Sequence, residues 1–342
     1  MRRMSFLLAI LLSISLSGCT ERAVFCTQER VCKEGSIPDS YELLFYGRDT
    51  GFVIPGLKQN FVPQGLAVWQ EANTLLLSGY FMPLSGSVSS VLLALDGTNG
   101  KLVGEYTLID SVGRNIGGHF SGVAVTERDL IVTGDHCLYR IPLACLGKGR
   151  TTLKVEQIIP LEISSDSCGF GRGELWVCEY YQQNRFPLQE EHVVFCGDGT
   201  EHHAWMVCYA FEDGLEAKCV FSIPDKIQGV AVLKDGALLL SQSYGRKNAS
   251  SLLVYDDPRS QPPDSYVMLA DRMLPMWNLD KEHLRQNISA PPMTEGCCGS
   301  KDGVYLIFES AAYYYRSFNA DNRSIHPTDT IWLIRPEPKT EH

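Results

Sequence analysis

The sequence lacks a hydrophobic run long enough to cross a membrane, and it has no long segment with a helical period of apolar residues. Its N-terminal apolar run, Phe6–Leu12, is far shorter than the roughly 20 residues of a membrane-spanning helix. Short apolar segments bounded by Gly and Pro recur along the 342 residues instead. These absences exclude a helical membrane protein and a helical bundle, and they predict an all-β fold.

Positive charge is also scarce. Lys and Arg number 30 against 40 Asp and Glu, which gives a formal net charge of −10. A surface this acidic repels nucleic-acid phosphates and anionic lipid headgroups. We therefore expect no nucleic-acid partner, and we expect any membrane contact to come from a covalent lipid anchor.

Familiar catalytic and metal-binding motifs are missing as well. The chain has no GxSxG, no HExxH, no phosphate-binding loop and no pair of cysteines spaced CxxC. The usual sequence evidence for a serine hydrolase, a zinc protease or a zinc ribbon is therefore absent. Motifs alone leave open whether the protein is an enzyme.

The first eighteen residues have the pattern of a secretory signal peptide, with Arg2 and Arg3 before the apolar run and small residues after it. The run ends in Leu16-Ser17-Gly18-Cys19, which resembles the bacterial lipobox. The resemblance implies that Cys19 carries a lipid that includes palmitate. The protein would then be an extracytoplasmic lipoprotein anchored in the cell envelope, either in the periplasm or at the cell surface. An ordinary secretory signal, with Cys19 in a disulfide, is the alternative. Removing residues 1–18 takes away two arginines, so the net charge falls from −10 to −12.

Twelve cysteines behind a secretory signal predict disulfide bonds. Cys26 with Cys32 would close a short loop, and Cys137 with Cys145 would staple a hairpin. The adjacent pair Cys297-Cys298 has two interpretations. One is a strained vicinal disulfide. The other, which we favour, is a separate partner for each cysteine, because neighbours in a strand point to opposite faces.

A short pattern recurs five times along the chain. It consists of a polar residue, a Gly in most copies, an apolar pair, a turn, an apolar triplet and a polar exit. The clearest copy is Ile227–Tyr244, and the others begin at Gln64, Ser121, Asp166 and Glu295. Units of roughly 40–60 residues with several short strands are typical of propeller blades. The sequence therefore predicts a single five-bladed β-propeller, with six blades as the alternative.

The apolar segment Tyr41–Tyr46 stands before the first copy. We expect it to form an N-terminal strand that completes the last blade beside Ile331–Ile334 and closes the ring. The predicted blades span 61–109, 118–161, 166–223, 226–271 and 292–336, with 272–291 as an insertion that includes a short helix at Asp280–Gln286. The domain boundaries follow: signal peptide 1–18, lipidated tether 19–36, propeller 37–338 and tail 339–342.

Over most of residues 60–310, the repeat resembles the propellers of the gluconolactonase, strictosidine synthase-like and paraoxonase group. In that group the Glu of a Glu-Gly pair at a blade start is a metal ligand facing the channel, and here Glu295-Gly296 fits. The resemblance implies a metal-dependent hydrolase of the lactonase or esterase type that holds calcium or zinc. The starts of the other copies, which carry Gln64, Ser121, Asp166 and Gln228, depart from that pattern.

Physical reasoning groups the same residues independently of the family. The strand that begins each copy is innermost, so Gln64, Ser121, Asp166, Gln228 and Glu295 would surround the channel mouth. The residues after the apolar triplets would lie nearby: Tyr80, Asp135, His136, Glu179, Tyr181, Gln242, Tyr244 and Glu309. Oxygen ligands suit calcium, and the candidate metal ligands are Glu295, Gln228, Gln64, Asp166 and Glu309. The alternative is that these polar groups bond to one another and to water.

Two functions remain. The first is a membrane-anchored monomer that binds a ligand or a protein partner at the channel mouth. The second is the metal-dependent hydrolase that the family resemblance implies. In either case a lone carboxylate such as Glu295 in an enclosed channel must be neutralised by a cation, a basic partner or a proton.

Overall fold

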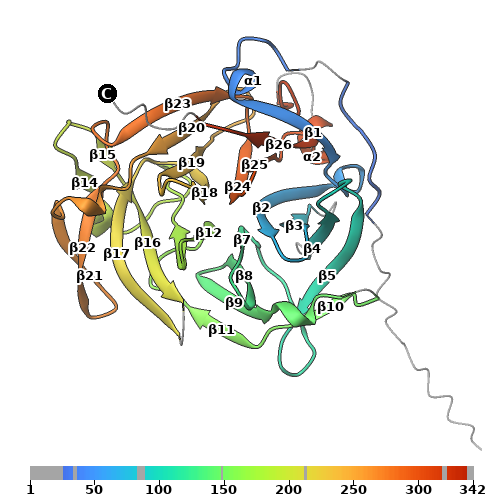
Figure 1. The fold of residues 1–342 in the computed structure, drawn as a ribbon, viewed down its shortest axis with the longest axis horizontal. Coiled ribbons are helices and arrows are strands. Elements are labelled where there is room, and N and C mark those ends of the chain that lie inside the picture. Colours follow the sequence, from blue (N-terminus) through green and yellow to red (C-terminus); the bar gives the residue numbers. More distant parts are fainter. Residues whose placement is uncertain are drawn as a thin grey trace, which may run out of the picture.

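The computed structural model describes residues 26–33, 37–82, 89–147, 149–211, 214–317 and 322–336. Five sheets, each with a core of four antiparallel strands, stand in a ring, and the chain follows the ring from blade one to blade five (Figure 1). This is the five-bladed β-propeller that the repeat predicted. In the described part of the chain, no helix is long and apolar enough to cross a membrane.

Each blade starts at the central axis and continues outward through four strands. Blade one holds β2 (Phe61–Trp69), β3 (Thr74–Phe81), β4 (Ser89–Asp96) and β5 (Leu102–Ile109). Blade two holds β7 (Gly122–Val125), β8 (Asp129–Gly134), β9 (Cys137–Pro142) and β11 (Gln157–Pro160). Blade three holds β12 (Ser167–Gly171), β13 (Glu174–Cys178), β16 (Ala204–Phe211) and β17 (Leu215–Ile223). Blade four holds β18 (Ile227–Val232), β19 (Leu238–Gln242), β20 (Ser250–Tyr255) and β23 (Leu284–Ala290). Blade five holds β24 (Thr294–Ser300), β25 (Gly303–Phe308), β26 (Thr330–Ile334) and β1 (Gly47–Val53).

Short strands, a hairpin and several helical turns lie outside the four main strands of each blade. β6 (Asn115–Ile116) and β10 (Thr152–Lys154) both pair with β5 of blade one, and β14 (Val194–Phe195) pairs with β15 (Glu201–His202). The hairpin of β21 (Ser265–Leu269) and β22 (Arg272–Asn278) extends blade three, because β22 pairs in parallel with β17. The helical turns are α1 (Leu43–Tyr46), α2 (Tyr313–Arg316), η1 (Leu57–Gln59), η2 (Leu143–Cys145), η3 (Glu190–His192) and η4 (Pro258–Ser260).

An N-terminal strand closes the ring, as expected. β1 runs antiparallel to β26, with Gly47 opposite Ile334 and Asp49 opposite Trp332, and the two strands lie side by side in Figure 1. The expected position of this strand was wrong, because the end of Tyr41–Tyr46 forms α1 and β1 begins one residue later. The helical turn buries Leu43 against the core that includes Trp332 and Ile334.

The outer edge of blade four also differs from the expectation. Asp280–Gln286 is not a helix, and the fourth strand of the blade is β23 (Leu284–Ala290). Ile288 and Ala290 are buried, whereas Asn287 is exposed and Ser289 is partly exposed, which is the alternation of a half-buried strand. The inserted segment is therefore the β21–β22 hairpin rather than residues 272–291.

Part of the segment expected to be a tether is bound to the propeller. The backbone nitrogens of Val31 and Cys32 donate to Oδ2 of Asp329 over 2.6 and 2.8 Å, and Arg30 pairs with Oδ1 of the same carboxylate at 3.1 Å. The backbone nitrogen of Cys26 donates to Glu105 in blade one over 3.0 Å. Residues 26–32 thus join the outer parts of blades one and five, while Cys19 lies outside the described residues.

The eleven cysteines that the structure describes are free thiols, so none of the expected disulfides is present among them. Cys297 and Cys298 are neighbours in β24 and belong to two different hydrophobic cores. Their side chains therefore point to opposite faces of the sheet, as the favoured interpretation of the pair required, although neither forms a disulfide.

The inner strands approach one another closely just beyond the residues that start the repeats. A Cβ atom on Gly229 would lie 2.8 Å from the carbonyl oxygen of Glu295, and one on Gly296 would lie 2.6 Å from that of Gln64. Real Cβ atoms essentially never come this close to backbone. Four blades carry glycine at this position and blade three carries serine: Gly65, Gly122, Ser167, Gly229 and Gly296.

Candidate functional site

A cavity of about 620 Å³ opens at the end of the propeller where the inner strands begin. We call it the mouth cavity. All five residues that start the repeats line it: Gln64, Ser121, Asp166, Gln228 and Glu295. Residues at the end of the second strand of each blade, or just after it, complete the wall, among them Tyr80, Asp135, His136, Tyr180, Tyr244 and Glu309. The repeat therefore located this cavity correctly.

Three predicted neighbours lie elsewhere. Glu179 is buried inside blade three, where it accepts bonds from the backbone nitrogen of Trp205 and from His192 Nδ1, each at 2.8 Å. Gln242 donates to the carbonyl oxygen of Asp225 over 2.9 Å. Tyr181 stacks on His203 with ring centroids 4.4 Å apart. These side chains support the blades and the connecting loop rather than the mouth cavity.

The floor of the mouth cavity is a pair of carboxyl groups. Glu295 at the start of β24 is 2% exposed, and its side chain is hydrogen-bonded to that of Glu309, which follows β25. Gln228 donates to Glu295 Oε1 over 3.1 Å, and Gln64 donates to Glu309 Oε2 over 3.3 Å. When no cation lies between them, two carboxyl groups in such contact repel each other strongly if both are charged, so the pair shares a proton.

Burial controls the acidity of this pair. It raises the pKa of Glu295 well above the ordinary carboxyl value, and the charge on Glu309 raises it further. Burial also raises the pKa of Glu309 to about 7, against the opposing effects of hydrogen bonds from Tyr315, Glu295 and Gln64 and of the charge on Arg246. Near neutral pH, Glu295 therefore holds a proton, and Glu309 gains or loses one with small changes in pH.

Two tyrosines extend the hydrogen-bond network from the carboxyl pair. The side chain of Tyr315 bonds to Glu309, and the side chain of Tyr80 bonds to Tyr315. Burial raises the pKa of both phenols, and the nearby Glu309 charge raises them further, so both hydroxyls stay protonated. The guanidinium of Arg246 lies over the Tyr315 ring, 5.0 Å from its centroid.

Sequence reasoning missed Tyr315. It belongs to α2, in the connection between β25 and β26, and the backbone nitrogen of its neighbour Tyr314 donates to Oδ1 of Asn60 over 2.7 Å. That contact between blades five and one places α2 over the mouth cavity. The run of three tyrosines, Tyr313–Tyr315, was the one available signal.

Asp166 lies apart from the carboxyl pair in the hydrogen-bond network. Its carboxylate accepts from the Ser164 hydroxyl and from the backbone nitrogen of Tyr180, the latter at 2.9 Å. Burial raises its pKa. Of the five candidate metal ligands, the hydrogen bonds therefore join Glu295, Gln228, Gln64 and Glu309, and Asp166 has partners of its own.

The four side chains joined by these hydrogen bonds carry carboxyl and amide oxygens, and oxygen atoms are the ligands that calcium prefers. In the structure the two amide nitrogens face the carboxyl groups, and the carboxyl groups face each other. Among the described residues, no group of three or more His, Cys, Asp or Glu side chains is placed to hold a metal ion.

Comparison with known proteins finds similar solved structures, all at low sequence identity. No protein family matches the chain, and no curated protein matches it. The resemblance to the gluconolactonase group therefore rests on the short repeat motifs. Similar solved structures include a glutaminyl cyclase from Myxococcus xanthus, with 9% identity, a TM-score of 0.42, and coverage of 73% of this chain and 87% of that one.

Two further structures are similar to a comparable degree. The PQQ-bound form of an aldose sugar dehydrogenase from Streptomyces coelicolor has 12% identity, a TM-score of 0.47, and coverage of 84% of this chain and 98% of that chain. Sqt1 from Chaetomium thermophilum, bound to the N-terminus of ribosomal protein L10, has 12% identity, a TM-score of 0.36 and coverage of 73% and 61%.

The pH dependence of stability tests the carboxyl pair. Because the pKa of Glu309 is raised on folding, its contribution to stability is complete at low pH and is lost as the pH rises toward about 7. Wild type should therefore lose stability between about pH 5 and pH 8, and Glu309→Gln should lose less, by up to about 3 kcal/mol. Urea unfolding at both pH values measures the difference. Glu127→Gln, an exposed control, should behave as wild type, and an unchanged slope in Glu309→Gln would contradict the shared proton.

Proposed function

We propose that the mouth cavity binds a small organic molecule that carries a positively charged nitrogen, and that the Glu295–Glu309 pair is the centre that recognises it. The observation that carries this proposal is a pair of buried, hydrogen-bonded carboxyl groups at the floor of a cavity of small-molecule size. A ligand cation that replaces the shared proton would leave both carboxylates charged and paired.

Charge and aromatic lining support the same ligand class. The mouth cavity is lined by four carboxyl groups and two arginines, so it is negative when all of them are ionised. Tyr80, Tyr180, Tyr244, Tyr314 and Tyr315 supply aromatic faces around it. Aromatic faces attract cations through their quadrupole, most strongly where water is excluded. A protonated amine attached to an apolar or aromatic body satisfies both features.

The metal-dependent hydrolase is the second candidate. It is favoured by one observation, the hydrogen-bonded group of two carboxyl and two amide side chains at the floor of the mouth cavity. This candidate requires calcium or zinc among those four groups, whereas the amine proposal requires no metal. Metal dependence therefore separates the two candidates.

A matched pair of probes tests the amine proposal. Benzylamine and benzyl alcohol have nearly the same shape, and the amine alone carries positive charge. Wild type should bind benzylamine more tightly, and its affinity should rise as the pH increases through the Glu309 pKa of about 7, because the ligand replaces a proton. Glu309→Gln should weaken binding roughly tenfold or more, as expected for loss of a charge-assisted hydrogen bond. Calorimetry in a chelating buffer measures each affinity.

Glu127→Gln, which removes an exposed carboxylate, should bind benzylamine as wild type does. Equal affinity for the two probes, or an affinity that Glu309→Gln leaves unchanged, would refute the amine proposal. A melting temperature that rises with calcium or zinc and not with benzylamine would favour the hydrolase instead.

We also propose that Cys19 carries a lipid that holds the protein at the extracytoplasmic face of a membrane. The lipobox Leu16-Ser17-Gly18-Cys19 supports this proposal. Wild type should fractionate with membranes, and Cys19→Ala should appear in the soluble extracytoplasmic fraction. Cys26→Ala is the matched control and should stay with the membranes. Unchanged fractionation of Cys19→Ala would rule out the anchor.

A further inference from the structure

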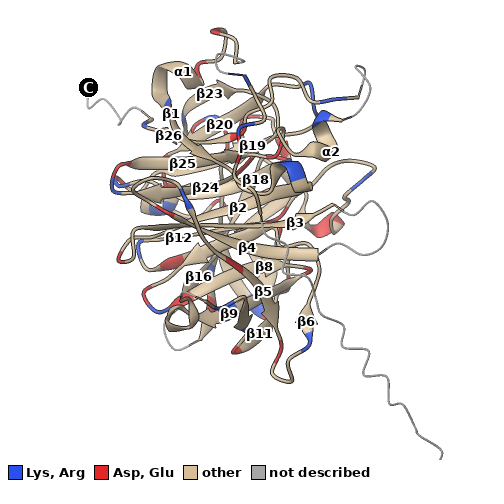
Figure 2. Cartoon of the chain, turned by 90° about the vertical axis from the view of Figure 1, so that its right-hand side faces the viewer, with Lys and Arg blue, Asp and Glu red and all other residues tan. Residues whose placement is uncertain are grey.

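The opposite end of the propeller holds a second cavity, of about 660 Å³, which we call the basic pocket. It is built largely from the turns that connect the inner strand of a blade to the next strand, and it shares no lining residue with the mouth cavity. In Figure 2, most of the ribbon coloured as Lys, Arg, Asp or Glu lies in the loops at the ends of the strands. The charge at each end of the propeller therefore depends on the residues in the turns at that end.

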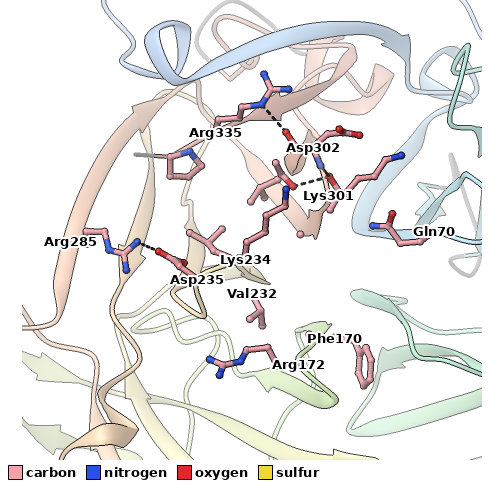
Figure 3. A pocket seen from close by; sticks show the side chains of 17 residues that line it. Gln70, Phe170, Arg172, Val232, Lys234, Asp235, Arg285, Lys301, Asp302 and Arg335 are labelled. Atoms are coloured by element: carbon pink, nitrogen blue, oxygen red, sulfur yellow. Dashed lines mark hydrogen bonds and ion pairs between the residues drawn. The ribbon is translucent and has the colours of Figure 1, made fainter. Parts of the chain in front are cut away.

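Three successive blades place a basic residue in this turn. Arg172 follows β12, Lys234 follows β18 and Lys301 follows β24. All three line the basic pocket and are exposed to solvent, and Figure 3 shows them around it. The basic side chains thus form an arc across blades three, four and five.

Basic residues outnumber acidic ones in this pocket, and three of them form no ion pair with a described residue. The lining includes five basic residues and two acidic ones, Asp235 and Asp302. Arg285 is paired with Asp235 and Asp256. Arg172, Lys234 and Lys301 form no ion pair with any described residue. A net positive pocket in a chain of net charge −10 is a local reversal of the electrostatic field.

The wall behind the charges is partly apolar. Phe170, Val232, Leu233 and Val304 line the pocket beside the arc of basic residues. Arg172 also packs against backbone, because its guanidinium lies where a side chain on Gly236 would have to be. Gly236 has a φ of +94°, which glycine adopts without strain. The pocket therefore combines a positioned arginine, two lysines and an apolar surface.

We propose that the basic pocket binds a small phosphate monoester whose other end is an apolar group. A phosphate carries two negative charges and several acceptor oxygens, which matches cations arranged in an arc better than a single planar carboxylate does. The apolar group would lie against Phe170 and its neighbours. This site is independent of the mouth cavity and of the function proposed for it.

Phenyl phosphate, inorganic phosphate and phenol are probes that separate the two halves of this ligand. Wild type should bind phenyl phosphate more tightly than either of the others, and its affinity should fall with added salt. The double variant Lys234→Gln/Lys301→Gln should bind phenyl phosphate at least about tenfold more weakly. Lys101→Gln/Lys154→Gln removes the same charge from exposed sites outside the pocket and should bind as wild type does. Calorimetry with the full chain measures all of these affinities.

Several results would overturn the proposal. One is the absence of phenyl phosphate binding to wild type at millimolar concentration, and another is equal weakening in the two double variants. If inorganic phosphate binds as tightly as phenyl phosphate, the apolar half of the ligand is wrong. If wild type instead sediments with vesicles of anionic phospholipid through Lys234 and Lys301 and does not bind phenyl phosphate, the arc is a membrane-facing surface and not a small-molecule site.

Discussion

The close packing of five inner strands around one axis is the constraint on which the rest of this molecule depends. At the position after the repeat start in four of the five blades, the backbone of the neighbouring blade occupies the space that a side chain would need, as at Gly229 and Gly296. Close backbone approach of this kind is a recurrent reason for glycine inside a strand. The same packing forces the preceding side chains, Gln228 and Glu295 among them, together at the mouth of the channel. The buried carboxyl pair is thus a consequence of how tightly five blades close.

Placing two buried carboxyl groups side by side has an electrostatic cost. A carboxylate at the floor of the mouth cavity loses water, and its nearest ionisable neighbour is a second carboxylate rather than a base. A shared proton is the least costly arrangement when no cation is present. At the other end of the axis, the turns carry the solvent-exposed Arg172, Lys234 and Lys301, which form no ion pair in the described part of the chain. One scaffold therefore presents two cavities of opposite charge, each defined by residues at equivalent positions in successive blades.

The sequence predicted the features that follow from the local repeat. Blade number and the five mouth residues were predictable because the copies share a short pattern of a polar residue, a Gly in all but the third copy, an apolar pair and an apolar triplet. The exact bounds of an element were harder to predict where burial, rather than the local pattern, decides the conformation. Tyr41–Tyr46 is apolar enough for a strand, yet its last four residues form a helical turn that buries Leu43, and β1 begins at Gly47.

Contacts between segments far apart in the chain were not predictable. Tyr315 reaches Glu309 because α2 is fixed by Asn60 of another blade, and no spacing in the sequence encodes that contact. The pairing of Glu309 with Glu295 rather than with Asp166 likewise depends on which blade each residue belongs to. The expectation of disulfides came from composition and compartment, and the described cysteines are distributed through several cores as free thiols.

The central claim is that Glu295 and Glu309 share a proton at neutral pH. Infrared spectroscopy detects the carbonyl stretch of a protonated carboxyl group directly, and ordinary carboxyl groups with a pKa of about 4 are fully ionised at about pH 8. Wild type at that pH should retain a protonated-carboxyl band, and Glu295→Gln should lose it. A wild-type spectrum without the band, or a band that survives in Glu295→Gln, would contradict the account.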